Sequence, residues 1–220
     1  MTKRTTRQVP TFSWSAPTRW TPKPSAMVLL LGGLIIFAIG DVLLINSNLG
    51  NSPWTTLAEG ISEHSPLSIG WATVVVSFVV LLLWIPIKER PGIGTVANAL
   101  VIGTTIVHTQ DRIPEPTALA ARVVFVVLGI AVIAAGGALY LSTHLGPGPR
   151  DGLMTGLGKR FDVPIARVRI TVEIVAMAIG TLLGGTIGLG TVAFALSVGH
   201  ILAFFLGQLA RVLGNRVEPS

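Results

Sequence analysis

Long apolar segments alternate with short polar ones along most of the chain. Crossing a bilayer as a helix takes about 20 mostly apolar residues. Six segments approach or meet that length: Ala26–Ile45, Ile69–Ile87, Gly94–His108, Arg122–Leu141, Ile165–Leu183 and Thr191–Leu206. The third is the shortest and the most polar, so its own composition fits a span or a re-entrant segment equally well. The pattern predicts an all-α polytopic membrane protein with six transmembrane helices.

The positions of the basic residues support that count. Lys and Arg are retained in the cytoplasmic loops of membrane proteins. With six spans and a cytoplasmic N-terminus, 16 Lys and Arg residues divide so that only Arg112 and Arg122 lie outside. Omitting the third span would move the basic cluster between Arg150 and Arg169 to the outside. The charges therefore favour six spans in the plasma membrane, with both termini cytoplasmic.

Composition narrows the class of protein further. Of the 220 residues, 50% are hydrophobic and only 12% are charged, and the formal net charge is +6. Soluble domains carry about 25% charged residues, so a soluble enzyme is not expected. The basic excess follows from topology, so no nucleic-acid partner is expected. The proline-rich residues 1–25 are expected to form a disordered cytoplasmic tail, and residues 207–220 a second cytoplasmic tail.

The chain contains an internal repeat with an offset of 96 residues. Gly92–Leu100 aligns without a gap with Gly188–Leu196, and 20 of 71 aligned positions between Gly33–Gly103 and Gly129–Gly199 are identical. The two copies are residues 26–110 and 118–206. Since each copy holds three spans, the second enters the membrane from the opposite side. The sequence thus predicts two inverted three-helix repeats, an arrangement common in secondary transporters.

Each copy also has a long connection after its first span. A small residue precedes proline in both, at Ser52-Pro53 and at Gly148-Pro149. Proline is favoured at the first helical position, after a Ser or Gly cap. A short helix is therefore predicted in each connection, with N-terminal N–H groups that attract anions. These half-helices are either re-entrant parts of a solute site or structural elbows lying flat on the membrane.

Five polar residues are candidates for solute binding or ion coupling: Asp41, Asn98, Arg150, Asp151 and Glu173. Ionisable groups inside a bilayer are costly and are commonly functional. A carboxyl group there can bind a cation or carry a proton, and an Arg fork can hold a carboxylate or phosphate. The structural alternatives are a hydrated Asp41, an Asp151 that caps a helix N-terminus and an Arg150 that serves only topology. Glu173 has its own alternative, an ion pair with Arg167 or Arg169, of which Arg169 has the i,i+4 spacing.

Several of these motifs resemble a known family. Leu49-Gly50-x-Ser52-Pro53-Trp54, Arg90-Pro91-Gly92-x-Gly94-Thr95 and Gly146-x-Gly148-Pro149-Arg150-Asp151-Gly152-Leu153 are similar to motifs of the bacterial YczE/YyaS/YitT-type integral membrane proteins, and most similar to the YczE branch. The resemblance covers roughly residues 26–206. It implies a multi-spanning bacterial plasma-membrane protein of a largely uncharacterised family, and no substrate or catalytic residue.

Two functions remain open at this stage. The first is a carrier of a small solute, and the alternative is a non-transporting scaffold or regulatory factor that acts through its cytoplasmic loop. No enzyme motif, cofactor or metal site is expected, because the four His residues show no ligand spacing and the chain has no Cys. Besides the lipid bilayer, a second copy of the chain is a candidate partner, through glycine-rich faces such as Gly180-x-x-x-Gly184-x-x-x-Gly188.

Overall fold

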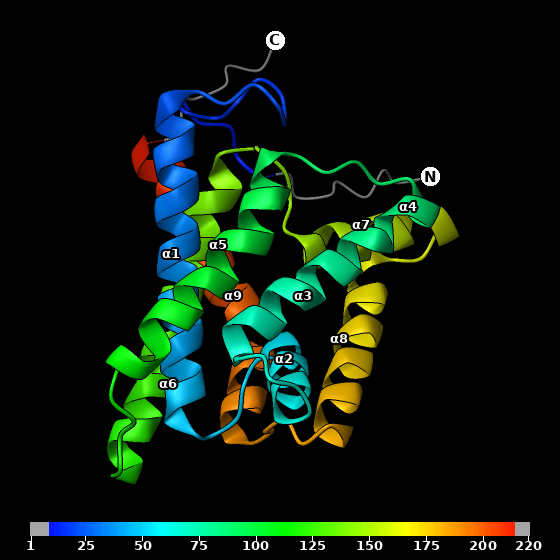
Figure 1. Cartoon of the computed structure of the whole chain (residues 1–220). Helices are drawn as coiled ribbons and strands as arrows, with labels where there is room; N and C mark the ends of the chain where they lie inside the picture. Colours follow the sequence, from blue (N-terminus) through cyan, green and yellow to red (C-terminus); the bar gives the residue numbers. More distant parts are fainter. Residues whose placement is uncertain (1–8, 214–220) are drawn as a thin grey trace.

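The computed structural model describes residues 9–213, and every regular element in that range is a helix (Figure 1). The helices are α1 (Pro24–Ser47), α2 (Pro53–Glu63), α3 (Ile69–Leu82), α4 (Trp84–Ile87), α5 (Ile93–Thr109), the 3-10 turn η1 (Gln110–Arg112), α6 (Leu119–Ser142), α7 (Pro149–Phe161), α8 (Ile165–Leu182) and α9 (Leu189–Leu213). Each of the six apolar segments contains a helix. Both predicted half-helices are confirmed, as α2 and α7.

One predicted segment is interrupted, and one predicted boundary was wrong. The second apolar segment keeps its predicted bounds, Ile69–Ile87, but breaks at Leu83 into α3 and α4, since Pro86 has no N–H to bond back to the carbonyl group of Leu82. The last helix continues to Leu213 instead of ending at Leu206, so only residues 214–220 of the predicted C-terminal tail remain, outside the described range.

The described part of the N-terminal tail is ordered, contrary to the prediction of disorder. Phe12 is buried, and the Ser15 hydroxyl donates to the carbonyl oxygen of Ser142 at 2.8 Å. The backbone N–H of Ala16 donates to the carbonyl oxygen of Thr143 at 2.9 Å. These bonds dock the segment on the end of α6, while residues 1–8 lie outside the described range. Prolines prevented a helix here, but they did not prevent docking.

Helices α1 and α6 form the most extensive helix pair. They run in opposite directions (Figure 1). Glycines allow the close approach: a Cβ atom on Gly40 would lie 2.7 Å from the backbone nitrogen of Ile133, and one on Gly33 would lie 2.8 Å from that of Tyr140. Small residues are the usual means by which membrane helices pack closely.

The three glycines predicted to form a dimerisation face, Gly180, Gly184 and Gly188, do not lie on one helix. Helix α8 ends at Leu182, so Gly184 and Gly188 lie in the connection to α9 and form no helix face with Gly180. Gly180 packs against the backbone of Leu57 in α2. The predicted glycine face is therefore wrong for this motif, and dimerisation stays a prediction.

The same contacts recur 96 residues apart along the chain. The N–H of Gly94 donates to the carbonyl oxygen of Leu145 at 2.8 Å, and that of Gly190 donates to the equivalent oxygen of Leu49 at 2.7 Å. The turns that follow are also equivalent, since Gly50 has φ of 104° and Gly146 has φ of 118°. The connection of each copy thus packs on the third long helix of the other copy, which interlocks the two halves.

Four helical stretches of the described chain are long and apolar enough to cross a membrane. They are α1, the stretch Ile69–Ile87, α6 and α9. Helix α5 has 17 residues, and α8 includes the charged residues Arg167, Arg169 and Glu173. Many large apolar side chains face outward on these helices, as expected for a surface in contact with lipid tails.

Candidate functional site

The N-termini of the two half-helices meet in the interior of the helix bundle. Trp54, the second residue of α2, and Arg150, the second residue of α7, are equivalent positions of the two repeats. The guanidinium carbon of Arg150 lies 5.3 Å from the centre of the Trp54 ring. A cation over an indole face is a favourable contact, stronger where water is excluded. The two repeats therefore contact each other through Trp54 and Arg150, which occupy equivalent positions but are different residue types.

Local sequence explains why the half-helices begin there. Ser52 caps α2, and its hydroxyl oxygen accepts from the backbone N–H of Thr55 at 3.4 Å. Gly148 caps α7 without a side chain. Pro53 and Pro149 occupy the first helical positions of α2 and α7, as predicted. Both helices thus present N-terminal N–H groups, the positive ends of their dipoles, to the centre of the molecule.

Asp41 of α1 is buried beside these helix ends. It is 2% exposed, and its Oδ2 atom has no hydrogen-bond partner among the described residues. Arg150 and Thr55 are the polar residues near its carboxyl group. The sequence placed Asp41 near a membrane surface, where hydration was the structural alternative, and the structure buries its side chain away from the molecular surface. Burying a carboxylate oxygen without a hydrogen-bond donor costs free energy. Binding of a proton, a cation or a water molecule to Oδ2 of Asp41 would remove that cost.

Arg150 and Asp151 have different surroundings although they are neighbours. The hydroxyl of Tyr140 donates to Oδ2 of Asp151 at 3.0 Å, and Asp151 lies in the first turn of α7, where the helix dipole favours a carboxylate. Arg150 is partly exposed. No hydrogen bond or ion pair within the described range holds its guanidinium group, which contacts the Trp54 ring. Its N–H donors are therefore available to a ligand.

The two remaining candidates lie at the edge of this cluster or outside it. The side-chain amide of Asn98 packs against Gly148, where a Cβ atom would lie 3.0 Å from its Nδ2. Glu173 forms an ion pair with Arg169 at 3.0 Å, the structural alternative expected from their spacing. The tertiary structure thus brings together Asp41, Arg150 and Asp151.

Three residues of the cluster were missed as site residues in the sequence. Tyr140, Thr55 and Trp54 have no chemical motif around them. Tyr140 carried one signal, because it is the chain's one Tyr and lies near the end of a span. Thr55 and Trp54 are the repeat mates of Asp151 and Arg150, so treating each candidate together with its mate would have found them.

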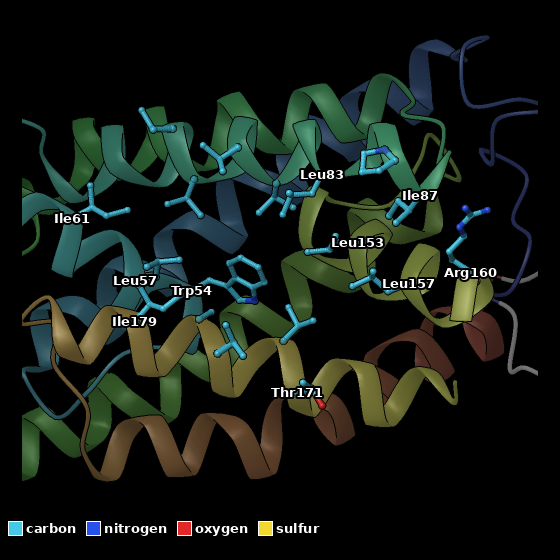
Figure 2. Close-up of a pocket in the computed structure, with 18 of the residues that line it drawn as sticks. Trp54, Leu57, Ile61, Leu83, Ile87, Leu153, Leu157, Arg160, Thr171 and Ile179 are labelled. Carbon is cyan, nitrogen blue, oxygen red and sulfur yellow. The ribbon is translucent and has the colours of Figure 1, made fainter. Parts of the chain in front are cut away.

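An apolar groove borders the cluster on the side of Trp54 (Figure 2). Its volume is about 790 Å³, and it is lined by residues of α2, α3, α4, α7 and α8. Trp54 lines the groove and also contacts Arg150. Within the described range, no group of three His, Cys, Asp or Glu residues gathers that could hold a metal ion. The site therefore combines a polar centre with an apolar flank.

Comparison with known proteins places the chain among membrane proteins of unknown function. An uncharacterized protein of Haemophilus influenzae is 44% identical over 210 residues, covering 96% of both chains. The uncharacterized membrane protein YczE of Bacillus subtilis is 30% identical over 90% of both chains. The uncharacterized protein YyaS of the same species is 26% identical, over 81% of this chain and 91% of the other. No solved structure matches.

These relatives confirm the resemblance to YczE-type proteins that the Gly-Pro-Arg-Asp-Gly-Leu motif indicated, and they confirm a membrane protein. The model of the family of unknown function DUF6198 matches residues 25–207. That range includes both half-helices and every residue of the polar cluster. The chain therefore belongs to the DUF6198 family.

Proposed function

We propose that this protein is a plasma-membrane carrier of a small anionic solute. One observation carries the proposal: within residues 9–213, the guanidinium group of Arg150 has no hydrogen-bond acceptor and lies over the ring of Trp54, and the nearby buried Asp41 has an oxygen without a donor. Helix N-termini each contribute about half a positive charge. Together with an Arg fork, they match the charge and geometry of a carboxylate or phosphate.

The charges of the cluster suggest how binding is balanced. Asp41 and Asp151 offset Arg150 when the site is empty. An anion that binds to the guanidinium group of Arg150 offsets its positive charge. Asp41 then no longer has an uncompensated positive charge beside it. Asp41 then takes up a proton, so that anion and proton occupy the site together. Asp151, unlike Asp41, has a hydrogen-bond donor in the hydroxyl of Tyr140 and lies in the first turn of α7, so its surroundings do not depend on Arg150 alone.

A transport role also agrees with the architecture that we propose for the whole chain. In this arrangement α5 and α8 cross the membrane together with the four more apolar stretches, giving two inverted three-helix repeats. The contacts that recur 96 residues apart support two equivalent halves. Successive long helices alternate in direction, and residues 9–23 lie at the same end as the C-terminal end of α9 (Figure 1). Inverted halves with half-helices pointing at a central site are typical of secondary transporters.

The polar cluster favours transport over the scaffold alternative. A scaffold that acts through its cytoplasmic loop needs no ionisable groups in its interior. Buried ionisable residues lower the stability of a membrane protein, so a role in binding explains Asp41 better than a structural role does.

The first experiment measures binding and proton movement in the same protein. Purified protein is screened by thermal unfolding against the sodium salts of chloride, nitrate, acetate, lactate and phosphate. Each stabilising anion is then added to proteoliposomes that contain a pH-sensitive dye. We expect at least one anion to raise the melting temperature and to acidify the interior of proteoliposomes beyond the acidification of protein-free vesicles, which acetic and lactic acid enter unaided.

Variants assign the two roles. Arg150→Gln is expected to abolish both stabilisation and acidification, while Asp41→Asn retains stabilisation and loses acidification. Arg167→Gln, which removes an exposed Arg at the start of α8, serves as the control and should change neither. The proposal is wrong if none of these anions acidifies the proteoliposomes beyond protein-free vesicles, or if Arg150→Gln behaves as the wild type does.

Membrane topology is tested separately by labelling single introduced cysteines, which is straightforward because the chain has no cysteine of its own. Glu63 and Lys159 are exposed repeat mates near the C-terminal ends of α2 and α7. In intact cells, an impermeant maleimide should label Glu63→Cys directly and Lys159→Cys only after permeabilisation. Labelling of both from the same side would contradict the inverted repeat.

A further inference from the structure

The groove next to Trp54 is a second feature with the size and lining of a ligand site. It lies between α3 and α8, with side chains of α2 and α7 as its floor (Figure 2). Of its 19 lining residues, only Arg160 and Thr171 carry polar side-chain groups apart from the indole of Trp54. Its volume of about 790 Å³ lies within the range of about 300–1,000 Å³ that is usual for ligand sites.

The groove is open toward the outside of the helix bundle. Val79 of α3 and Val175 of α8 are repeat mates on its two walls, and they are 52% and 51% exposed. The lining extends from Val75 to Ile87, which at about 1.5 Å per residue is roughly 18 Å. That is slightly more than half of the ~30 Å hydrocarbon thickness of a bilayer. The groove therefore has the length of an acyl chain of one leaflet.

Charge is confined to one end of the groove. Arg160, in the last turn of α7, lines that end and is exposed to solvent. Lys159 and Lys88 are close in sequence to the same end. Two acidic residues lie near this end: Glu89, which is already paired with Arg19 at 3.4 Å and with Lys159 at 3.5 Å, and the exposed Asp162, which follows α7. Arg160 is the charged residue that lines the groove itself. The opposite end, near Ile61 and Ile179, is apolar. An occupant that matches both ends has one anionic group and one long hydrocarbon chain.

We propose that the groove binds an anionic glycerophospholipid, with one acyl chain between α3 and α8 and its phosphate on Arg160. The basic end favours an anionic headgroup over a neutral one, by about 1 kcal/mol per Lys or Arg near an anionic membrane surface. This site is separate from the Arg150 cluster and does not depend on transport. The bound chain contacts Trp54, which makes the binding measurable.

The experiment uses Trp54 as the reporter. Full-length protein is reconstituted in phosphatidylcholine vesicles that contain increasing mole fractions of brominated phosphatidylglycerol, and brominated phosphatidylcholine is compared. Bromine atoms quench tryptophan fluorescence on contact. The Trp54 signal is obtained by subtracting the fluorescence of Trp54→Phe. We expect phosphatidylglycerol to quench this signal at a lower mole fraction than phosphatidylcholine does.

Variants separate the headgroup contact from the chain contact. Arg160→Gln should raise the phosphatidylglycerol fraction needed for half-quenching about fivefold, the factor that corresponds to ~1 kcal/mol. Val79→Phe combined with Val175→Phe fills the groove and should reduce the maximum quenching. The controls are Arg167→Gln, and Val124→Phe on the outer face of α6, where Val124 is 51% exposed. Both should behave as the wild type does.

Two results would overturn the proposal. Equal quenching by the two lipids, unchanged by Arg160→Gln, would show that no anionic headgroup is selected. A Trp54 signal that neither lipid quenches would show that acyl chains do not enter. In that case, disulfide-linked dimers of Val79→Cys would assign the groove to a second copy of the chain.

Discussion

A close contact between α1 and α6, at Gly40, gives the sharpest quantitative prediction. Gly40→Ala adds a Cβ atom 2.7 Å from the backbone nitrogen of Ile133 and 2.8 Å from the carbonyl oxygen of Gly129. Backbone atoms cannot move aside as a flexible side chain can, so the helices must separate. Overpacking of this kind costs about 1–3 kcal/mol. Because Asp41 is the next residue, the separation also moves the carboxyl group away from the half-helix ends.

Gly32 of the same helix supplies a matched control. A Cβ atom on Gly32 has no neighbour within 4 Å. Both substitutions gain the same helix propensity, about 1 kcal/mol, so the difference between the two variants isolates the overpacking. Unfolding by sodium dodecyl sulfate in mixed micelles should therefore place Gly40→Ala about 1–3 kcal/mol below Gly32→Ala. Equal stabilities would refute the tight α1–α6 interface.

Other predictions follow from the cluster and from the turns. Gly50→Ala, at a position with φ of 104°, should lower the free energy of unfolding by at least about 1 kcal/mol, measured in the same titration; an unchanged midpoint would contradict the left-handed turn. A double-mutant cycle with Trp54→Leu and Arg150→Gln should give a coupling of about 0.5–2 kcal/mol, and additive effects would argue against the stacking. Arg169→Gln should cost no more than about 1 kcal/mol, because the ion pair with Glu173 is partly exposed; a larger loss in thermal unfolding would show a deeper role for that pair.

The sequence by itself determined the elements and their internal relationship. Apolar runs located all six long helices, since a spanning helix needs a long apolar stretch, although they did not give the C-terminal end of α9. Ser52-Pro53 and Gly148-Pro149 located the half-helices, because a cap followed by proline is a local signal. The repeat of 96 residues indicated that the two halves are equivalent. It also identified Arg150 and Asp151 as departures from the pattern of the first copy.

Only the tertiary structure decided which polar residues share a site. Asp41 and Arg150 are 109 positions apart in the chain, and they become neighbours because each connection packs on the opposite repeat. Helical periodicity gives the face of a residue within its own helix but not the helix that this face meets. Glu173 had a local partner at the spacing of one turn, so the sequence could find that pair. The contact of Trp54 with Arg150, the bond from Tyr140 to Asp151 and the docking of residues 9–23 join distant segments, and only packing of the whole chain brings such segments together.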